Sequence, residues 1–404
     1  MAKPFCNVAE LGVPLIDADA HVQEPPDLWV DRVPASWRDR APRVEQGADG
    51  GDQWVFDGGA AVRPIGLSAT AGQHVVQFRA AGGRYADMRA GSYEAKARLV
   101  DLDADGIAAQ VLFPSMTLEG ARLCARDRAL QRVCVRAYNE WLAEFCEDGE
   151  GRLHGLAVMP TTGVDDALDE LEAALALGHR GVLLSAFPNG SRAPEPDDER
   201  FWGAVEAAGL PAAVHLGSFV TPRVSRWPDT QRLEFLALAG AAKAGAHAIE
   251  LAATLLFAGI FERCPGLRVL LAEAGIGWIP TALEQLDAMF LRYRWVGEAA
   301  ERMQALPSEV FRRHLWASFI TDRVGLEHLD RLPVAHVLWS TDYPHDTCDW
   351  PNSRLTLEAQ FRGVPLDAVR AMVSANAATL YRLEAASLGS APAGLKTSES
   401  PRTV

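Results

Sequence analysis

Eight short apolar segments, separated by stretches with helical periodicity, constrain the fold of this chain more than any other feature. Most are continuous apolar runs without the alternation of a half-exposed strand, which is typical of strands covered on both faces. They begin near Leu15, Gly106, Leu153, Gly181, Pro211, Leu267, Leu315 and His336. Eight strands that alternate with helices predict an α/β fold of the (β/α)8 TIM-barrel class. An open doubly wound sheet is the alternative, but no G-x-G-x-x-G motif follows an early strand.

The chain of 404 residues is long for one barrel, and residues 43–80 account for part of the excess. This segment contains glycine pairs and short apolar runs, which predict an inserted hairpin or small β subregion after the first strand, over the mouth of the fold. We therefore expect residues 1–384 to form a single barrel domain. Residues 385–404 are small and polar with interspersed prolines, and predict a disordered tail.

Charge and cysteine usage exclude several classes of partner. The net charge is -14 and no Lys/Arg run is present, which argues against nucleic acid and anionic membranes. No apolar stretch reaches the roughly 18 residues of a membrane span, and the N-terminal residues lack a signal-peptide pattern. The six cysteines are scattered without a C-x-x-C pair, as is typical of free thiols in a reducing cytoplasm. We expect a cytoplasmic protein with a small-molecule substrate, and the composition allows a homodimer without requiring one.

The first strand segment carries four groups that can bind a metal or move a proton, namely Asp17, Asp19, His21 and Glu24. Side chains alternate faces along a strand, so Asp17, Asp19 and His21 are expected to share one face. Such groups in one small space repel each other or lose hydration, and a divalent cation between them removes that cost. Glu24 lies in the following loop and is expected to touch the metal or to orient His21. A polar strand end with a plain turn or cap is the alternative.

Catalytic groups of a (β/α)8 barrel cluster at the C-terminal ends of its strands. Further along the chain, predicted strand ends supply His215 from the fifth strand, Glu273 from the sixth and Asp342 from the eighth. Histidine and carboxylate ligands suit zinc, manganese or iron(II) and disfavour a thiolate site. We therefore predict one divalent ion, with Asp19, His21, His215 and Asp342 as ligands. His345 follows Asp342 by three residues and could reach the substrate or a metal-bound water, or stabilise its own loop.

Four segments together resemble a known family: IDADAH, AVHLG, LAEAGIGWIP and STDYPHDTCDWPNS. They are similar to the amidohydrolase-related proteins of the second type, metal-dependent (β/α)8 enzymes close to aminocarboxymuconate-semialdehyde decarboxylase. The resemblance implies that His21, His215 and Asp342 hold one divalent metal. Asp19 stands in place of the family's first histidine, as in relatives several of which are aromatic-acid decarboxylases. Glu273 stands where decarboxylase members carry a histidine.

Two reactions fit these residues. In the first, a metal-activated water attacks an amide, ester or lactone, Glu273 or Asp342 takes its proton, and Asp342 returns it to the leaving group. In the alternative, an aromatic or unsaturated carboxylic acid loses CO₂ without oxidation, and an acidic residue protonates the carbon. The replaced sixth-strand histidine favours hydrolysis and the acidic Asp19 favours decarboxylation. We expect a hydrolase that uses zinc, with manganese or iron as alternatives, and keep a ligand-binding barrel without turnover as a second alternative.

Overall fold

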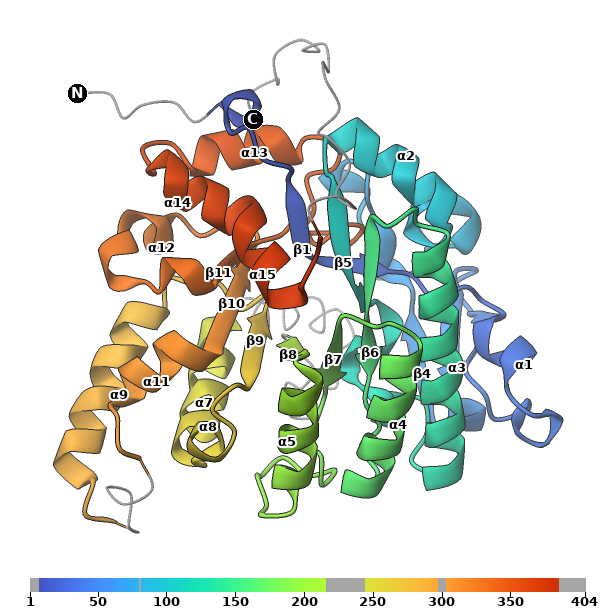
Figure 1. Cartoon of the computed structure of the whole chain (residues 1–404). Coiled ribbons are helices and arrows are strands. Elements are labelled where there is room, and N and C mark those ends of the chain that lie inside the picture. Colours follow the sequence, from blue (N-terminus) through green and yellow to red (C-terminus); the bar gives the residue numbers. More distant parts are fainter. Residues whose placement is uncertain (1–6, 80, 216–243, 297–302, 385–404) are drawn as a thin grey trace.

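The computed structural model describes residues 7–79, 81–215, 244–296 and 303–384 (Figure 1). Eight parallel strands form one sheet that follows the chain order and makes a nearly closed barrel. The strands are β1 (Ile16–Val22), β5 (Ala109–Pro114), β6 (Leu153–Val158), β7 (Gly181–Leu184), β8 (Pro211–His215), β9 (Arg268–Ala272), β10 (Leu315–Phe319) and β11 (Val337–Trp339). Almost every strand residue is buried, as expected for a sheet with one face in the barrel core and the other under helices. The predicted (β/α)8 fold is confirmed.

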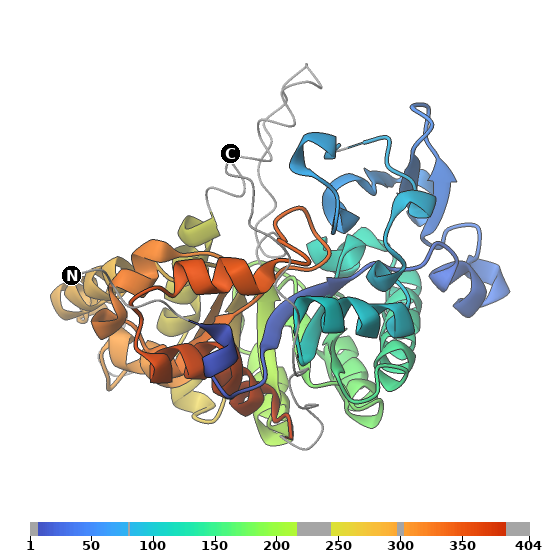
Figure 2. The same cartoon turned by 90° about the horizontal axis from the view of Figure 1, so that it is seen from above.

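Helices lie between the strands and cover the outside of the barrel (Figures 1 and 2). Their bounds are α1 (Leu28–Arg32), α2 (Ala95–Asp105), α3 (Arg128–Glu147), α4 (Val164–Ala176), α5 (Asp198–Ala208), α7 (Ala244–Phe257), α8 (Ile260–Arg263), α9 (Ile279–Tyr293), α11 (Pro307–His314), α12 (Arg323–Glu327), α13 (Ser353–Gln360), α14 (Leu366–Arg370) and α15 (Asn376–Tyr381). The helix α3 shows how the sequence specifies them. Asp127 caps its first turn by accepting from the backbone N of Leu130, and buried residues such as Leu130, Cys134 and Tyr138 then recur every four positions. None of the helices in the described residues combines the length and apolarity needed to cross a membrane.

The barrel closes between its first strand and the segment that follows its last. The backbone N of Asp342 donates to the carbonyl O of Asp19 at 3.1 Å, and the N of His21 donates to the O of Tyr343 at 2.6 Å. These bonds join residues more than three hundred positions apart in the sequence. Because Asp19, His21 and Asp342 are predicted ligands, the seam of the barrel passes through the predicted metal site.

The strand β1 contains a bulge, which separates Asp17 from the other acidic groups of this segment. Asp17 pairs with Gln110 and His21 pairs with Phe113, so β1 uses one residue more than β5 over the same distance. One extra residue turns a side chain to the opposite face of the sheet. The expectation that Asp17 shares the face of His21 is therefore wrong. The Asp17 carboxylate instead accepts from the backbone N of Thr341 at 2.9 Å and from Nε2 of Gln110 at 2.9 Å, and burial raises its pKa to about 7.

The insertion after β1 contains a three-stranded antiparallel sheet of β2 (Arg43–Gln46), β3 (Asp52–Phe56) and β4 (Ala61–Pro64). Figure 2 shows it in blue as a separate layer beside the barrel. Residues 65–79 that follow form short 3-10 turns, with no strand among them. The backbone N atoms of Thr70 and Ala71 both donate to the carbonyl O of Pro344, at 2.8 and 3.1 Å. The insertion is thus attached to the loop that follows β11. The predicted tail of residues 385–404 lies outside the described residues.

A buried arginine joins the barrel to α2. Arg98 is fully buried, and its guanidinium donates to the carbonyl O of Gly91, to the O of His21 at 2.7 Å and to Oε1 of Gln110 at 2.9 Å. It also lies over the ring of Tyr343, 4.4 Å from the ring centroid. A buried cation is stabilising only when such partners satisfy it, so this arginine and its acceptors depend on one another.

We predict that Arg98→Met lowers the free energy of unfolding by about 3 kcal/mol or more, because two buried carbonyl groups lose their donor. Urea denaturation followed by circular dichroism measures the change. The matched control is Arg84→Met, since Arg84 is exposed and pairs with Asp87 at the surface, and its unfolding midpoint should equal that of the wild type. Equal midpoints for both variants would contradict the prediction.

Candidate metal centre

Four predicted ligands meet at the C-terminal end of the barrel. Asp19 and His21 lie in β1, His215 is the last residue of β8, and Asp342 follows β11. Two overlapping groups have ligand atoms that all lie within 4.8 Å of one another: Asp19, His21 and His215 form the first, and His21, Asp342 and His345 form the second. Side chains that are far apart in the sequence therefore face one small space, because parallel barrel strands all end at the same rim.

The distances inside this space are short. Nε2 of His21 lies 3.0 Å from Oδ1 of Asp342 and 3.8 Å from Oδ1 of Asp19. Nε2 of His215 lies 3.4 Å from the same Oδ1 of Asp19 and 3.6 Å from Oε2 of Glu273. The residues Asp19, His21, His215 and Asp342 are each at most 2% exposed.

The residues fit a divalent cation. Oδ1 of Asp19 is buried and has no hydrogen-bond partner among the described residues. A buried carboxylate oxygen without a donor is costly, and a cation removes that cost. Two carboxylates and two imidazoles are a donor set that suits manganese, iron(II) or zinc. The orphaned oxygen lies beside the imidazoles that would complete the set.

Neighbouring groups orient the candidate ligands. Nδ1 of His21 lies 2.8 Å from the carbonyl O of Pro114, which can only accept, so Nδ1 carries the hydrogen and Nε2 presents its lone pair to the site. Oγ of Ser318 donates to Oδ2 of Asp19 at 2.9 Å and accepts from the backbone N of Glu273 at 2.8 Å. Ser318 in β10 thus links the end of the adjacent strand β9 to Asp19 of β1.

Burial and neighbouring charge set the protonation of the site. Burial, with the His345 imidazole beside it, lowers the pKa of His21 to about 4, so its ring is neutral and able to ligate. Burial alone would raise the pKa of Asp342, but His345 and His21 reverse this and hold the pKa below its usual range. Burial, assisted by the charge of Asp342, raises the pKa of Glu273. The site therefore offers a cation the carboxylate of Asp342 and the neutral imidazole of His21.

Two residues of the site have a backbone conformation that is rare outside glycine. The φ angles are +52° for Glu273 and +60° for Asp342. Each such residue costs of order 1–3 kcal/mol, and such conformations concentrate at functional sites. Both residues come just after a strand, where this backbone turn directs the side chain toward the mouth of the barrel.

Of the remaining predicted site residues, Glu24 lies outside the two ligand groups and His345 belongs to the second of them. The carboxylate of Glu24 accepts from the backbone N of Met116 at 2.9 Å, and from the N and Oγ1 of Thr117 at 3.0 and 2.9 Å. It joins the loops after β1 and β5 and belongs to neither ligand group within the described residues. Nδ1 of His345 lies 3.1 Å from Oδ1 of Asp342, and its ring stacks on His21 with centroids 3.8 Å apart.

Three hydroxyl side chains of the site were not anticipated from the sequence. Ser318 contacts Asp19, Ser115 contacts His345, and Oγ1 of Thr347 donates to Oδ2 of Asp342. Serine and threonine occur throughout the chain, and only the fold places these three beside the ligands. Of the three, only Ser115 could have been singled out from the sequence, because it directly follows a predicted strand.

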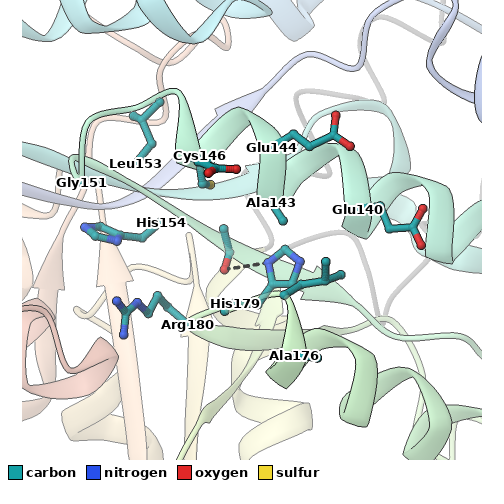
Figure 3. Close-up of a pocket in the computed structure, with 14 residues that line it drawn as sticks. Glu140, Ala143, Glu144, Cys146, Gly151, Leu153, His154, Ala176, His179 and Arg180 are labelled. Carbon is teal, nitrogen blue, oxygen red and sulfur yellow. Dashed lines mark hydrogen bonds between the residues drawn. The ribbon is translucent and has the colours of Figure 1, made fainter.

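A cavity of about 730 Å³ lies at the opposite end of the barrel, where β6 and β7 begin. Figure 3 shows His154 and Arg180 on one side of it and Glu140 and Glu144, carried by α3, on the other. Nδ1 of His179 lies 3.3 Å from the carbonyl O of Gly155. None of the predicted site residues lines this cavity, so it is distinct from the metal centre.

Comparisons with known proteins agree with this architecture. A family model described as amidohydrolase matches residues 16–383. A gamma-resorcylate decarboxylase of Rhodococcus jostii strain RHA1 is 28% identical over 278 residues, which are 64% of this chain and 79% of that protein. An amidohydrolase structure from Mycobacterium avium subsp. paratuberculosis K-10 superposes with a TM-score of 0.70 at 19% identity, covering 91% of this chain and 99% of that one. The structure of a dihydroxybenzoic acid decarboxylase from Polaromonas sp. JS666, with bound manganese and the inhibitor 2-nitroresorcinol, gives a TM-score of 0.61 at 17% identity and covers 92% of this chain and 97% of that one.

These relatives contradict hydrolysis as the main reaction. The curated proteins that match the sequence are gamma-resorcylate decarboxylases, which favours the alternative reaction over the expected one. The error has a chemical reason. A carboxyl group beside a metal can take a proton from water or give one to carbon, and the residue type is the same in both cases.

The family model spans nearly all of the chain, from the first barrel strand to the end of the last helix. Its limits agree with those of the barrel rather than with a single motif. The chain therefore belongs to the amidohydrolase family Amidohydro_2.

Proposed function

We propose that this protein is a metal-dependent, non-oxidative decarboxylase of a hydroxylated aromatic carboxylic acid. The observation that carries the proposal is the cluster of Asp19, His21, His215 and Asp342 at the barrel mouth, in a chain whose curated relatives are decarboxylases. The acidic Asp19 in the first position supports the same reaction. A small aromatic substrate agrees with the inhibitor bound by the Polaromonas relative.

The candidate ligands would hold one divalent cation. That cation would supply positive charge for a substrate carboxylate and its neighbouring hydroxyl. We prefer manganese to the zinc expected from the sequence, because half of the donors are carboxylates and the Polaromonas relative binds manganese.

The side chains of the site would perform the proton transfer. An acidic group gives its proton to the ring carbon that bears the carboxylate, forming a C–H bond. The C–C bond to the carboxylate then breaks, its electron pair returns to the ring, and CO₂ leaves. We assign the proton transfer to Asp342, whose carboxylate would first take the proton of the substrate hydroxyl and then pass it to the ring carbon. Its Oδ1 lies between His21 and His345, whereas the Glu273 side chain lies at the edge of the cluster and is 22% exposed.

We predict that the manganese-loaded protein releases CO₂ from at least one hydroxybenzoic acid and leaves lactones and amides intact. A panel of hydroxybenzoates, methoxylated carboxybenzoates, lactones and amides tests this, with CO₂ measured by a coupled assay. In D₂O, proton NMR should show one deuterium at the carbon that lost the carboxylate. Turnover of a lactone or amide without any CO₂ release would overturn the proposal.

A further inference from the structure

Both ring nitrogens of His345 have a partner. Nδ1 lies 3.1 Å from Oδ1 of Asp342, and Nε2 lies 3.1 Å from Oγ of Ser115. A carboxylate oxygen only accepts hydrogen bonds, so Nδ1 must carry a hydrogen. In the neutral ring Nε2 then accepts, and the Ser115 hydroxyl donates to it. The direction of this hydrogen-bonded chain, from Ser115 through His345 to Asp342, follows from the acceptor at its end.

The contacts of Asp342 determine where its carboxylate points. Its backbone N still donates to the carbonyl O of Asp19, but with φ at +60° the backbone has left the regular strand geometry. Oδ2 accepts from Oγ1 of Thr347, and Oδ1 faces His21 and His345. The ring of His345 is itself stacked on His21 with an interplanar angle of 22°. His345 is therefore placed to hold Oδ1 on the cation side.

Ser115 is held from its other side. It comes directly after β5, is 9% exposed, and its backbone N donates to the carbonyl O of Val22 at 3.1 Å. The next two residues, Met116 and Thr117, donate to the buried carboxylate of Glu24. The loop that carries Ser115 is thus tied to the end of β1 by both backbone and side chain. Because this turn is anchored, the Ser115 hydroxyl can hold the His345 imidazole in one orientation.

We propose that Ser115 is a positioning residue of the metal centre, which acts through His345 to set the direction in which Asp342 presents Oδ1 to the cation. This inference rests on the proposed metal site, though not on the identity of the substrate. It also gives Glu24 a part in the site: Glu24 anchors the turn from which Ser115 reaches His345.

The test is a double-mutant cycle in the full-length protein, with Mn²⁺ alone as the probe. Titration calorimetry of the metal-free protein gives the dissociation constant for Mn²⁺. Loss of a partner that orients a metal ligand typically weakens metal affinity about 10- to 100-fold. We expect such a loss for Ser115→Ala and for His345→Ala. Because Ser115 acts through His345, the double variant should bind Mn²⁺ no more weakly than His345→Ala alone.

Ser374→Ala is the matched control. Ser374 is a buried serine in the helical segment 371–375, outside the metal centre, and its loss should leave Mn²⁺ affinity unchanged. Ser115→Thr, which keeps the hydroxyl, should restore affinity to within about threefold of the wild type. The visible spectrum of the Co²⁺-loaded protein should shift in Ser115→Ala and not in Ser374→Ala.

The outcomes separate this inference from the proposed function. Wild-type Mn²⁺ affinity in Ser115→Ala, or losses that multiply in the double variant, would overturn the role of Ser115 whatever the reaction is. Coupled losses of Mn²⁺ affinity, without CO₂ release from any acid, would support the positioning role and refute the decarboxylase. A wild-type protein that binds no Mn²⁺ would refute both.

Discussion

Asp342→Asn is expected to lower the rate of CO₂ release about 1,000-fold, because an amide cannot give a proton to carbon. The substitution is well matched to the site. Asparagine tolerates left-handed backbone conformations better than most residues, so the φ of +60° can be kept. The amide retains an oxygen for the hydrogen bond from Thr347. Initial rates of CO₂ release, together with the unfolding midpoint, measure the effect on chemistry and on folding separately.

The control for this variant is Glu273→Gln. Glu273 shares the site and also has a positive φ, but its carboxylate lies farther from the centre of the cluster, 3.6 Å from His215. We expect the rate of CO₂ release to fall by about 10-fold at most in Glu273→Gln, because this variant changes a residue beside the cluster and keeps the proton-transferring group. The reverse order, with Glu273→Gln inactive and Asp342→Asn active, would assign the proton transfer to Glu273.

Removal of the metal is expected to reduce CO₂ release to about 1% or less, and added Mn²⁺ should restore it. His215→Ala should lose activity to a similar extent and respond poorly to Mn²⁺, because one of the candidate ligands is missing. Dialysis against a chelator, elemental analysis and activity measured against added Mn²⁺ provide the readouts. Full activity in a protein shown to be metal-free would contradict the prediction.

His154→Ala is the matched control for the histidine variant. His154 is also a buried histidine on a barrel strand, but it lines the cavity at the opposite end of the barrel. Its loss should leave both metal content and the response to Mn²⁺ unchanged. Equal losses in the two histidine variants would point to a general effect on folding.

The barrel could be predicted because its strands are apolar on both faces, but the ends of the strands could not. The segments starting at Gly181, Leu315 and His336 read as strands up to Phe187, Asp322 and His345, whereas the strands end at Leu184, Phe319 and Trp339. The remaining residues of each segment form the loops at the barrel mouth. Each loop continues directly from its strand and still contains buried apolar residues, such as Phe187 and Tyr343, so the sequence pattern does not mark where the strand ends.

The meeting of Asp19, His21, His215 and Asp342 could be anticipated from one rule, that barrel strands end at a common rim. The position of Asp17 could not, because a bulge leaves no trace in the pattern of residue types. The hydroxyl groups of Ser115, Ser318 and Thr347 could not be selected among many others without the fold. The prediction of hydrolysis was wrong because a carboxyl group beside a metal can take a proton from water in hydrolysis or give one to carbon in decarboxylation, and the sequence does not distinguish the two.

The seam of the barrel has a consequence for when the site can exist during synthesis. Asp19 and His21 leave the ribosome early, while Asp342 emerges only after more than three hundred further residues. The hydrogen bonds between Asp19 and Asp342, and between His21 and Tyr343, form only when the two ends of the sheet have met. A nascent chain therefore lacks the complete set of candidate ligands. A cation can bind to the full set only after the barrel has closed.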